Sequence, residues 1–572
     1  MASWVLMVTV CGCDADRGDS EAGGENAPHT ATVDGGPAPE VPVVPPVTEE
    51  SPGDEELPPP LDCDGTGDFA GIAKSALVAL ADTNRDGEVD GDDLAGRNQW
   101  TWSRGAFLSP NLDDDDSDGK PDAEDEVPNG SADADDLAPV RVELGCLAAL
   151  RSRSVTIHVI EGASATRVFL NGPSGFVAMS GPLPSASSIL LGMEANRLIG
   201  ADFNGFVRLR VEANDETGEL VAADEVKLRI APWIMLPSTA PAIDVHVASG
   251  VYDNGTFRTD LNAATSDAAV TLAPPFLASH WQEMWAQDTM EIGYTQLPGR
   301  SPQYVVLQAN RDHDGHAPSL LGADMGVIRV GTKRDLVGGD AWADWFGNLE
   351  VSPPVEGWPL GRIYYGHNTS TGTTLHPDVV AFLNAQEVQA PFWVDTSWLL
   401  IKHVDELLTF VRTAAGETKL VVVSPREAGL LYPSYYGPYN QGLQSKIDKA
   451  LDGGSYLVNG VVTESPGILA ALRLDRTDVV ELPIFFTDGT ADWSNPVNAL
   501  VLDDTYVLGE TDIWQAERDV TEERLTALGL AVRWVDDAAY HANLGNVHCA
   551  TNATRSPVLD QFVEGIPPAL QP

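Results

Sequence analysis

Basic residues are scarce in this sequence. Lys and Arg number 34 against 85 Asp and Glu, which gives a formal net charge of −51 at pH 7. A chain this acidic repels a phosphate backbone, so we expect no nucleic-acid partner. Long apolar runs are also missing, because no segment approaches the roughly 18 to 20 apolar residues that span a bilayer. The chain has 572 residues and 43% of them are hydrophobic, which excludes a single small module and wholesale disorder.

The first 61 residues are typical of an export signal followed by a tether. An apolar stretch leads into Val10-Cys11-Gly12-Cys13, which resembles the lipobox of bacterial lipoproteins. We therefore expect a signal segment over residues 1–13, lipidation of Cys13, and an exported protein that is anchored at the cell envelope or secreted. The alternative is a chance apolar N-terminus. Residues 14–61 are rich in Pro, Gly and Glu, which predicts a disordered tether and leaves the lipid as the only membrane contact.

Cysteine is rare, with five residues in the whole chain. Export would permit a disulfide, and Cys63 and Cys146, which flank the next region, are the natural candidates. Cys549 is then left over as a free thiol near the end of the chain. We expect this thiol to be reactive.

Two folded regions are expected after the tether. Residues 62–236 contain short alternating segments that predict strands of a β-sandwich. These segments are residues 155–160, 207–211 and 226–230. Residues 237–572 mix strand-like and helical patterns, which indicates an α/β domain large enough to hold an active site. The strand-like run is residues 419–423, and the helical patterns are residues 404–411 and 521–530.

The sandwich region is intensely acidic between residues 82 and 136. Two stretches there repeat the spacing by which a twelve-residue loop wraps Ca²⁺, with Gly87 and Gly119 at the sixth position, where a sharp turn is needed. The expected ligands are Asp82, Asn84, Asp86, Asp90 and Asp93 in the first loop, and Asp114, Asp116, Asp118, Asp122 and Asp125 in the second. Oxygen ligands without His or Cys favour Ca²⁺ over zinc. The alternative is a solvated acidic run.

Three stretches of the last region combine the ingredients of thiol chemistry. Asp288 lies close to Trp285, His403 lies two residues before Asp405, and Cys549 supplies a thiol. A thiol can serve as nucleophile and an imidazole as acid and base when the fold brings them together. Taken singly, each residue also fits a plain structural role.

Together these stretches resemble the protein-arginine deiminases, from about residue 82 to the C-terminus. The matching motifs are Ala231-Pro232-Trp233-Ile234-Met235, Gln287-Asp288, Met290-Glu291-Ile292-Gly293-Tyr294, Phe346-Gly347-Asn348-Leu349-Glu350-Val351-Ser352-Pro353-Pro354, His403-Val404-Asp405-Glu406 and Val547-His548-Cys549. The resemblance implies a C-terminal α/β five-bladed pentein propeller over residues 237–572. It also implies that an all-β immunoglobulin-like sandwich with Ca-binding loops precedes the propeller. The implied activity is Ca²⁺-dependent conversion of peptidyl arginine to citrulline.

The resemblance further implies a role for each matching residue. Asp288 and Asp405 would clamp the flat guanidinium, and Cys549 would attack its central carbon to form a thiouronium intermediate. His403 would protonate the departing ammonia and then activate water. We expect two substrate contacts in addition. Trp285 would pack against the arginine stem, with a core Trp as the alternative, and Arg311 would hold the substrate backbone, because His313 stands where the family carries an Arg.

Calcium ligands in the catalytic region are implied in the same way. They are Gln287, Glu291, Glu350 and the backbone carbonyls of Phe346 and Leu349, next to Asp288. The stretch Asn111-Leu112-Asp113 resembles the family's calcium-binding middle domain, and Asp115 is expected as a further calcium ligand. Thr289 and Gln308 stand where relatives carry acidic residues, so a second catalytic-domain site is expected to be weakened or absent. Several Ca²⁺ ions are therefore expected as cofactors.

Three functions remain open from the sequence. The leading one is an exported, Ca²⁺-dependent protein-arginine deiminase, active as a monomer on an arginine-containing protein or peptide. A pentein hydrolase acting on free arginine or agmatine is the alternative enzyme. A non-catalytic calcium-binding surface protein is the third, and the presence of Asp288, His403, Asp405 and Cys549 together argues against it.

Overall fold

The computed structural model describes residues 77–124, 128, 130–145, 154–179, 181–184, 187–250, 252–311, 313–333 and 341–557. Cys13, Cys63, Cys146 and Asp125, for which lipidation, a disulfide and a calcium-ligand role are predicted, lie outside these residues. In the described ranges, no helix combines the length and the apolar character that a membrane span requires.

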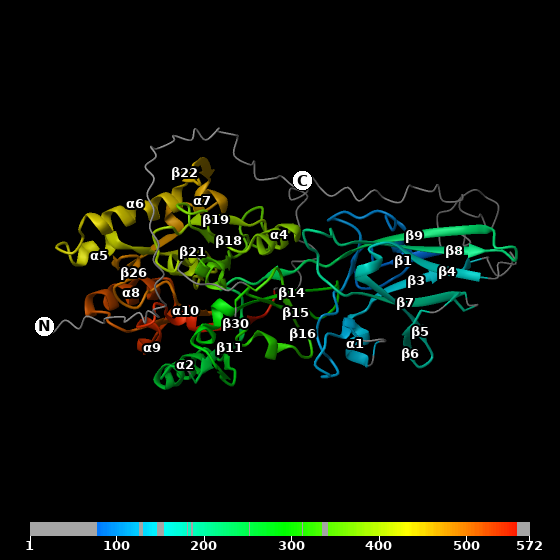
Figure 1. Cartoon of the computed structure of the whole chain (residues 1–572), viewed down its shortest axis with the longest axis horizontal. Helices are drawn as coiled ribbons and strands as arrows, with labels where there is room; N and C mark the ends of the chain where they lie inside the picture. Colours follow the sequence, from blue (N-terminus) through cyan, green and yellow to red (C-terminus); the bar gives the residue numbers. More distant parts are fainter. Residues whose placement is uncertain are drawn as a thin grey trace, which may run out of the picture. The chain divides into compact units, whose positions relative to one another are not determined.

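Two sheets in the first part of the described chain share one apolar core (Figure 1). The first has the order β1 (Val78–Ala81), β3 (Ala138–Glu143), β7 (Ser188–Ala195), β5 (Thr166–Gly172) and β6 (Gly175–Ala178), with antiparallel neighbours. The second has the order β2 (Ala106–Leu108), β9 (Leu220–Ile230), β8 (Phe206–Asn214) and β4 (Ser154–Glu161). Alternate residues of β8, such as Val207, Leu209 and Val211, are fully buried. The period-two pattern of the sequence therefore predicted these strands correctly.

Short helical segments lie between these strands. They are η2 (Gly91–Leu94), η3 (Asp122–Glu124), α1 (Ser131–Asp136) and η5 (Ala163–Ala165). The first three belong to the acidic stretch. Gly87 and Gly119 both have a φ of +88°, so the sharp turn predicted for the sixth position of each loop is present.

Five small sheets in the rest of the described chain share one pairing pattern. In each, a first strand pairs antiparallel with a second, and the second pairs parallel with a third. The first sheet is β14 (Met290–Thr295), β15 (Gln303–Gln308) and β16 (Met325–Arg329), and the second is β17 (Leu349–Val351), β18 (Ile363–His367) and β19 (Phe392–Asp395). The third is β20 (Leu408–Arg412), β21 (Thr418–Ser424) and β24 (Val479–Pro483), and the fourth is β27 (Leu500–Leu502), β28 (Thr505–Gly509) and β29 (Ala531–Val535). The fifth is β30 (Thr551–Arg555), β11 (Ala242–Ser249) and β12 (Thr271–Leu272). The fifth sheet joins the end of this region to its beginning, because β30 pairs with β11.

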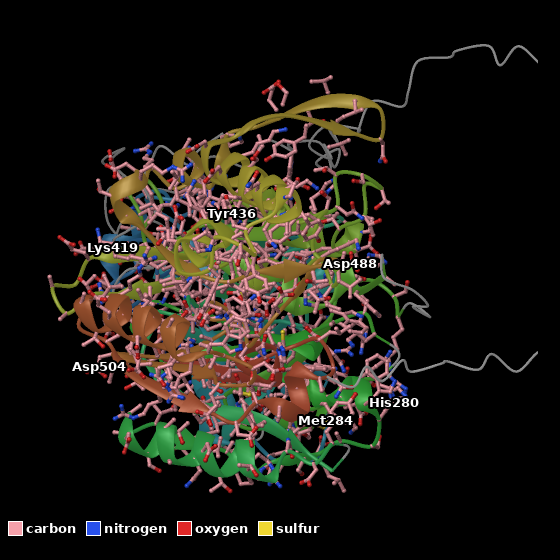
Figure 2. All side chains as sticks on the ribbon, turned by 90° about the vertical axis from the view of Figure 1, so that its left-hand side faces the viewer. His280, Met284, Lys419, Tyr436, Asp488 and Asp504 are labelled. Atoms are coloured by element: carbon pink, nitrogen blue, oxygen red, sulfur yellow. The ribbon has the colours of Figure 1, made fainter. Side chains whose placement is uncertain are left out.

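Each parallel pair requires a crossover connection, and helices supply most of them. The connecting helices are η7 (Ala317–Leu320), α4 (Pro377–Ala385), α5 (Pro425–Leu431) with α6 (Pro438–Asp452) and α7 (Gly467–Ala471), α8 (Gln515–Ala527), and α2 (Gly255–Asp267). Further strands are β10 (Ile234–Met235), β13 (Phe276–Leu277), and the hairpins β22 (Gly454–Val458) with β23 (Val461–Ser465) and β25 (Phe486–Thr487) with β26 (Thr490–Ala491). Side chains fill the space between the layers, with Tyr436, which follows α5, above Met284 in the view of Figure 2.

The sequence predicted some of these elements correctly and one wrongly. The strand over 419–423 is β21, and most of the helix predicted over 521–530 is α8, which ends at Ala527. The helix predicted over 404–411 is wrong. That stretch contains a single 3-10 turn, η10 (Val404–Glu406), followed by β20. Consecutive residues of β20 from Leu408 to Val411 are buried, so the apolar run reflects a strand covered on both faces.

A short segment precedes the first strand of each of the five sheets. These segments are α3 (Ala286–Thr289), η9 (Phe346–Asn348), η10, the loop 493–499 and α10 (Val547–Ala550). The residue two positions before each first strand is Asp288, Gly347, Glu406, Asn498 and Cys549, in chain order. The pairing pattern therefore places these five residues at equivalent positions in the five sheets.

Candidate active site

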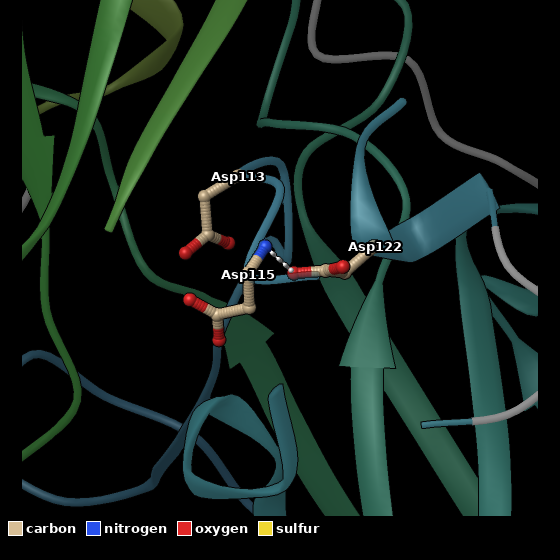
Figure 3. Close-up of side chains that lie close together, drawn as sticks. All are labelled: Asp113, Asp115 and Asp122. Carbon is tan, nitrogen blue, oxygen red and sulfur yellow. Dashed lines mark hydrogen bonds between the residues drawn. The ribbon is translucent and has the colours of Figure 1, made fainter. Parts of the chain in front are cut away.

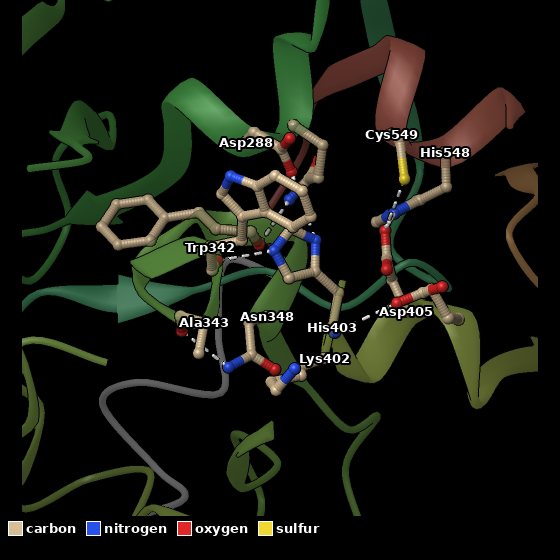
Figure 4. Close-up of polar contacts among 12 residues, drawn as sticks. Asp288, Trp342, Ala343, Asn348, Lys402, His403, Asp405, His548 and Cys549 are labelled. Atoms are coloured by element: carbon tan, nitrogen blue, oxygen red, sulfur yellow. Dashed lines mark hydrogen bonds and ion pairs between the residues drawn. The ribbon is translucent and has the colours of Figure 1, made fainter. Parts of the chain in front are cut away.

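Asp288, His403, Asp405 and Cys549 come together from three segments that are far apart in the sequence (Figure 4). Nδ1 of His403 lies 3.4 Å from Oδ1 of Asp288, and Sγ of Cys549 lies 3.4 Å from Oδ2 of Asp405. A Cβ built on Gly347 would lie 2.5 Å from Nδ1 of His403, 2.8 Å from Oδ1 of Asp288 and 3.2 Å from Oδ2 of Asp405. These three atoms therefore surround one point, which a residue without a side chain keeps open.

Several buried atoms around this point have no hydrogen-bond partner. They are Oδ1 of Asp288, Oδ1 of Asp405 and Nδ1 of His403, on side chains that are almost completely buried. Leaving a buried polar atom unpaired costs about 1–3 kcal/mol, and more for a charged group. The site is thus prepared for a ligand that brings N–H donors and positive charge. Burial raises the pKa of Asp288, and the nearby Asp405 carboxylate acts in the same direction.

The orientation of His403 is fixed by contacts on its far side. Its Nε2 donates a hydrogen bond to the carbonyl oxygen of Trp342 at 2.8 Å, which leaves Nδ1 facing the site. Asn348 links the surrounding segments, because its Oδ1 accepts the backbone N–H of Val404 at 3.1 Å and that of Gly366 at 2.8 Å. These bonds tie η9, which carries Gly347, to η10 and to β18.

The thiol of Cys549 lies in a strongly acidic environment. Burial raises its pKa well above the usual value, and the carboxylates of Asp405, Asp288 and Glu406 raise it further. Nδ2 of Asn498 lies 3.1 Å from Sγ. A narrow pocket reaches this residue, and its lining includes Leu400, Gly489, His541 and Leu544. These surroundings therefore favour the thiol over the thiolate, and a cation that offsets the negative charge would favour the thiolate.

His548 is a site residue that the sequence reasoning missed. Its Nδ1 lies 2.9 Å from Oδ2 of Asp405, and its Nε2 lies 3.3 Å from Oε1 of Glu350. Burial lowers the pKa of His548, but the two carboxylates outweigh it, so the pKa is raised overall. Its position directly before Cys549 was the one available signal.

The two predicted substrate contacts are both buried. Trp285 is 4% exposed, packs edge-on against Tyr540 and touches the backbone at Gly545, which favours its interpretation as a core residue. The guanidinium of Arg311 lies 3.9 Å from the ring centre of Trp345 and donates to the carbonyl oxygen of Gln282 at 2.9 Å.

Beyond these contacts, Nη1 of Arg311 lies 3.9 Å from Oδ2 of Asp288, so its charge faces the clamp carboxylate. The imidazole of His313 stacks on that of His280 at 3.8 Å between ring centres. These placements keep Arg311 inside the fold and leave His313 in a half-buried aromatic pair.

The residues expected to hold calcium in the catalytic region lie together beneath this site. Nε2 of Gln287 is 2.8 Å from Oε2 of Glu291 and 3.5 Å from the carbonyl oxygen of Phe346. Burial raises the pKa of Glu350 to about 7, and Asp405 adds to the shift. Burial raises the pKa of Glu291 well above its usual value, and Glu350 adds to that shift. Oε1 of Glu350 is buried without a hydrogen-bond partner. Oxygen donors with excess negative charge fit Ca²⁺.

The residues expected to weaken a second catalytic-domain site are occupied by internal hydrogen bonds. Oγ1 of Thr289 donates to the carbonyl oxygen of Ala286 at 2.9 Å. Nε2 of Gln308 donates to the carbonyl oxygen of Asp314 at 3.2 Å. Neither side chain supplies the charge that an acidic residue would bring.

The second acidic loop forms two groups of clustered carboxylates, the first of which is drawn in Figure 3. Ligand oxygens of Asp113, Asp115 and Asp122 all lie within 4.8 Å of one another. Those of Asp114, Asp116 and Asp122 do the same. The two groups take alternate residues along the chain and share Asp122, whose Oδ1 is buried without a partner.

The charge of these clusters indicates a cation. Burial raises the pKa of Asp113 and of Asp122 to about 7, and neighbouring carboxylates add to the shift. Asp118 lies outside both clusters, and its Oδ1 accepts the backbone N–H of Lys120 at 2.9 Å. An all-oxygen donor set with several carboxylates fits Ca²⁺ better than a transition metal.

Residues from other segments complete this acidic cluster, and the sequence reasoning missed them. Nδ2 of Asn111 donates to Oδ1 of Asp133 and to Oε2 of Glu194, both at 2.9 Å. Burial, together with Asp113 and other carboxylates, raises the pKa of Asp136 to about 8.

The catalytic region also reaches the acidic cluster. Asp324, directly before β16, donates its backbone N–H to Oδ2 of Asp113 at 3.0 Å, and Gln303 of β15 donates its side-chain amide to Oδ1 of the same residue. These partners lie about 200 residues further along the chain, so no local spacing could reveal them.

The first acidic loop has a different internal geometry. Oδ2 of Asp82 accepts the N–H of Gly87 and Oδ1 of Asn84 accepts that of Asp86, both at 3.1 Å. Asp93 is turned towards the backbone, where Oδ2 accepts the N–H of Asp90 at 2.9 Å. Burial raises the pKa of Asp82 to about 6. Among the described residues, the first loop contains no group of three clustered carboxylates like those of the second.

A buried thiol, two carboxylates that each keep one oxygen without a hydrogen-bond partner, and an oriented imidazole define a hydrolase site for a cationic substrate. Comparisons with known proteins agree. The family model "Protein-arginine deiminase (PAD)" matches residues 220–441. Mouse protein-arginine deiminase type-4 is 30% identical over 86% of this chain and 83% of its own length, and human type-1 is 30% identical over 83% and 80%.

A solved structure, the agmatine deiminase of C. jejuni, overlaps 57% of this chain and 98% of its own at 10% identity. The TM-score of 0.37 is too low to carry a structural argument. The sequence relatives suffice: this chain belongs to the protein-arginine deiminase family and is a hydrolase of that family.

Proposed function

We propose that the protein hydrolyses the guanidinium of protein-bound arginine to citrulline and ammonia, in a calcium-dependent reaction that passes through a thiouronium on Cys549. The observation that carries this proposal is that Asp288 and Asp405 each keep one buried oxygen without a hydrogen-bond partner, while the other oxygen of Asp405 faces the thiol. A guanidinium has N–H donors on its edges and a full positive charge, which is what two such oxygens require.

Substrate binding itself would prepare the nucleophile. The guanidinium neutralises Asp288 and Asp405, whose charges hold the pKa of the Cys549 thiol high, so the thiolate becomes accessible once the substrate is in place. The thiol proton passes to His403, and the thiolate sulfur then forms a bond to the central carbon, giving a tetrahedral adduct.

His403 would manage the protons of the next two steps. The C–N bond breaks as the imidazolium of His403 gives its proton to the departing ammonia, which leaves a thiouronium on Cys549. The neutral imidazole then takes a proton from water, whose oxygen adds to the same carbon. Cleavage of the C–S bond returns the thiolate, and the proton of the added hydroxyl leaves with the released ammonia as ammonium, which forms the carbonyl. One water is therefore consumed and one ammonium released for each citrulline formed.

Calcium would be held by Gln287, Glu291, Glu350 and the carbonyls of Phe346 and Leu349, and by the acidic clusters around Asp113 and Asp122. In the catalytic region the ion would neutralise Glu291 and Glu350 and so hold together the segments that carry Asp288 and Gly347. This role of calcium is supported by the burial of Glu291 and Glu350, whose carboxylates repel each other, and by Oε1 of Glu350, which has no hydrogen-bond partner.

The finer fold assignment is also a proposal. We propose a five-bladed pentein propeller over residues 237–572 behind an immunoglobulin-like sandwich over residues 62–236. The five repeated strand pairings and the shared core of the two sheets support this arrangement. Export with lipidation of Cys13, the Cys63–Cys146 disulfide and a monomeric state remain predictions from the sequence.

Citrulline formation from a blocked arginine peptide and from free arginine tests the proposal. Each substrate is assayed with Ca²⁺, with a chelator, and with Mg²⁺ as the control cation. We expect citrulline and an equal amount of ammonia from the peptide with Ca²⁺ alone. Activity on free arginine alone would identify a small-molecule hydrolase instead. No ammonia from either substrate would leave a non-catalytic calcium-binding protein.

A further inference from the structure

We propose that Asn498 is a positioning residue that holds the sulfur of Cys549 in place and stabilises its thiolate. This proposal deepens the proposed function and rests on Cys549 as its nucleophile. No motif in the sequence singled out Asn498. The structure assigns it through its contacts, its position in the repeated sheet pattern and the charge around the sulfur.

Asn498 contacts the nucleophile and its neighbour through three groups. Its side-chain N–H donates to Sγ of Cys549 at 3.1 Å, and its Oδ1 accepts the backbone N–H of Cys549 at 3.2 Å. Its carbonyl oxygen accepts the backbone N–H of His548 at 3.1 Å. The side chain is 1% exposed, so water does not compete for these bonds. Because Oδ1 is held by a backbone donor, the amide presents its N–H to the sulfur.

The repeated pattern of the five sheets supports the same assignment. Asn498 lies two residues before β27, the position that Asp288, Gly347, Glu406 and Cys549 occupy in the other four sheets. Asp288 and Cys549 carry the proposed chemistry, and Gly347 borders the point where the reacting groups meet. The carboxyl of Glu406 accepts the backbone N–H of His403 at 3.2 Å. Asn498 is the contribution of the fourth sheet to this set.

The negative charge around the sulfur of Cys549 explains why the side-chain N–H of Asn498 matters. Oδ2 of Asp405 lies 3.4 Å from Sγ, and Asp288 and Glu406 also raise the pKa of the thiol. Three carboxylates oppose formation of a thiolate, whereas an N–H donor favours it, because hydrogen bonding stabilises the charged form that accepts it. Asn498 therefore acts against the carboxylates that the substrate requires, and it keeps the sulfur reactive while the guanidinium is bound.

The test measures alkylation of Cys549 by iodoacetamide as a function of pH in the full chain with Ca²⁺, following the Cys549 peptide by mass spectrometry. Asn498→Asp keeps the size and the acceptor for the Cys549 N–H but replaces the donor with an anionic oxygen. We expect the midpoint of the alkylation profile to rise by about one pH unit or more. We also expect kcat for citrulline formation to fall about 100-fold, with KM changed by less than about threefold. Asn498→Ala should shift the midpoint in the same direction by less.

Asn440→Asp is the matched control. Asn440 is also buried and bonds both the N–H and the carbonyl of one backbone residue, Phe486, at 3.1 and 3.3 Å. It should leave the alkylation midpoint unchanged even where it lowers thermal stability. An Asn498→Asp profile that coincides with the unmodified protein's would overturn the proposal and leave Asn498 as a structural residue. Failure of the proposed function would be seen separately, because the unmodified protein would then form no citrulline from the blocked peptide, or would keep forming it after Cys549 is alkylated.

Discussion

Nδ1 of His548 lies 2.9 Å from Oδ2 of Asp405, the same oxygen that faces the sulfur of Cys549 at 3.4 Å. On its other side, Nε2 of His548 lies 3.3 Å from Oε1 of Glu350. One imidazole thus touches a residue proposed to clamp the substrate and a residue proposed to bind calcium. The two functions of the site are in contact through a single side chain.

Replacing His548 should therefore affect calcium binding and catalysis in opposite directions. In His548→Gln the cationic competitor beside Glu350 is gone, so we expect calcium to bind several-fold more tightly, equivalent to about 1 kcal/mol. Asp405 loses the partner that orients it, so kcat should fall about tenfold or more. Calorimetric calcium titration and steady-state kinetics measure the two effects. Weaker calcium binding in this variant would contradict the competition between imidazole and metal.

Cys549→Ala should remove citrulline formation, with a loss of about 10³-fold or more. The acidic clusters around Asp113 and Asp122 involve no contact with Cys549, so calcium binding there should be unchanged. Cys549→Ser serves as the control that preserves shape and hydrogen bonding. Turnover above about one per cent in the Ala variant, measured as ammonia release, would exclude the thiol as nucleophile.

Asp405→Asn should make the thiol more reactive and the enzyme less active. The carboxylate raises the pKa of Cys549, so a neutral amide lowers that pKa and increases the thiolate fraction at neutral pH. We expect alkylation at pH 7.5 to be faster than in the unmodified protein, whereas kcat/KM for a blocked arginine peptide should fall about 10³-fold. Slower alkylation would mean that Asp405 acts on the sulfur in some way other than by its charge.

Asp122→Asn should raise thermal stability when calcium is absent and lower it when calcium is present. Asp122 belongs to both carboxylate clusters, and burial with neighbouring charges raises its pKa to about 7. Without calcium, the neutral amide relieves repulsion and should raise the thermal midpoint by a few degrees. With calcium in excess, a ligand is missing and the midpoint should lie below that of the unmodified protein. Scanning calorimetry with chelator and with calcium resolves the two signs, and Asp519→Asn, at an exposed position of α8, is the control.

His316 should make stability fall as the solution becomes acidic. Its ring stacks on Phe276 at 4.4 Å, and burial followed by the nearby His246 lowers its pKa to about 4, from about 6.5 when unfolded. The neutral ring is favoured in the folded state, so its contribution is complete above pH 6.5 and is lost progressively as pH falls from 6.5 to 4.

The loss should amount to about 1–2 kcal/mol once the partial exposure of the ring is taken into account. His316→Gln should flatten this part of the profile, as measured by urea midpoints at pH 4.5 and 7. An unchanged slope in the variant would assign the pH dependence to other groups.

The sequence predicted correctly the strands and turns whose pattern depends only on residues close together in the chain. The alternation in β4, β8 and β9 reflects sheets with one buried face, and the glycines of the acidic loops reflect a backbone turn. The stretch 404–411 was predicted wrongly because β20 is buried on both faces, which removes the alternation that distinguishes a strand from a helix. The fivefold repetition is a repetition of strand pairing, and the sequence carries no matching repeat.

The candidate site was predictable only in part for a similar reason. Asp288, His403, Asp405 and Cys549 lie in recognisable motifs, whereas Asn498 and Asp324 have no local signature. Their roles come from the residues that the tertiary structure places against them, Cys549 in one case and Asp113 in the other. Trp285 was predicted to contact the substrate because it lies near Asp288 in the chain. Closeness in the sequence does not determine the direction in which its ring points.

The equivalent positions in the five sheets have a consequence for how the enzyme could be taken apart. Each sheet places one residue at or next to the catalytic centre, so a fragment that lacks any of the five sheets should be inactive. The hairpin of β22 and β23 lies within the crossover of the third sheet and has an exposed tip at Asn459 and Gly460. Division at that tip leaves the first two sheets whole in one polypeptide and the fourth sheet whole in the other, while the third and fifth sheets take strands from both. They should complement each other when mixed, which would make this a natural place to build a split reporter enzyme.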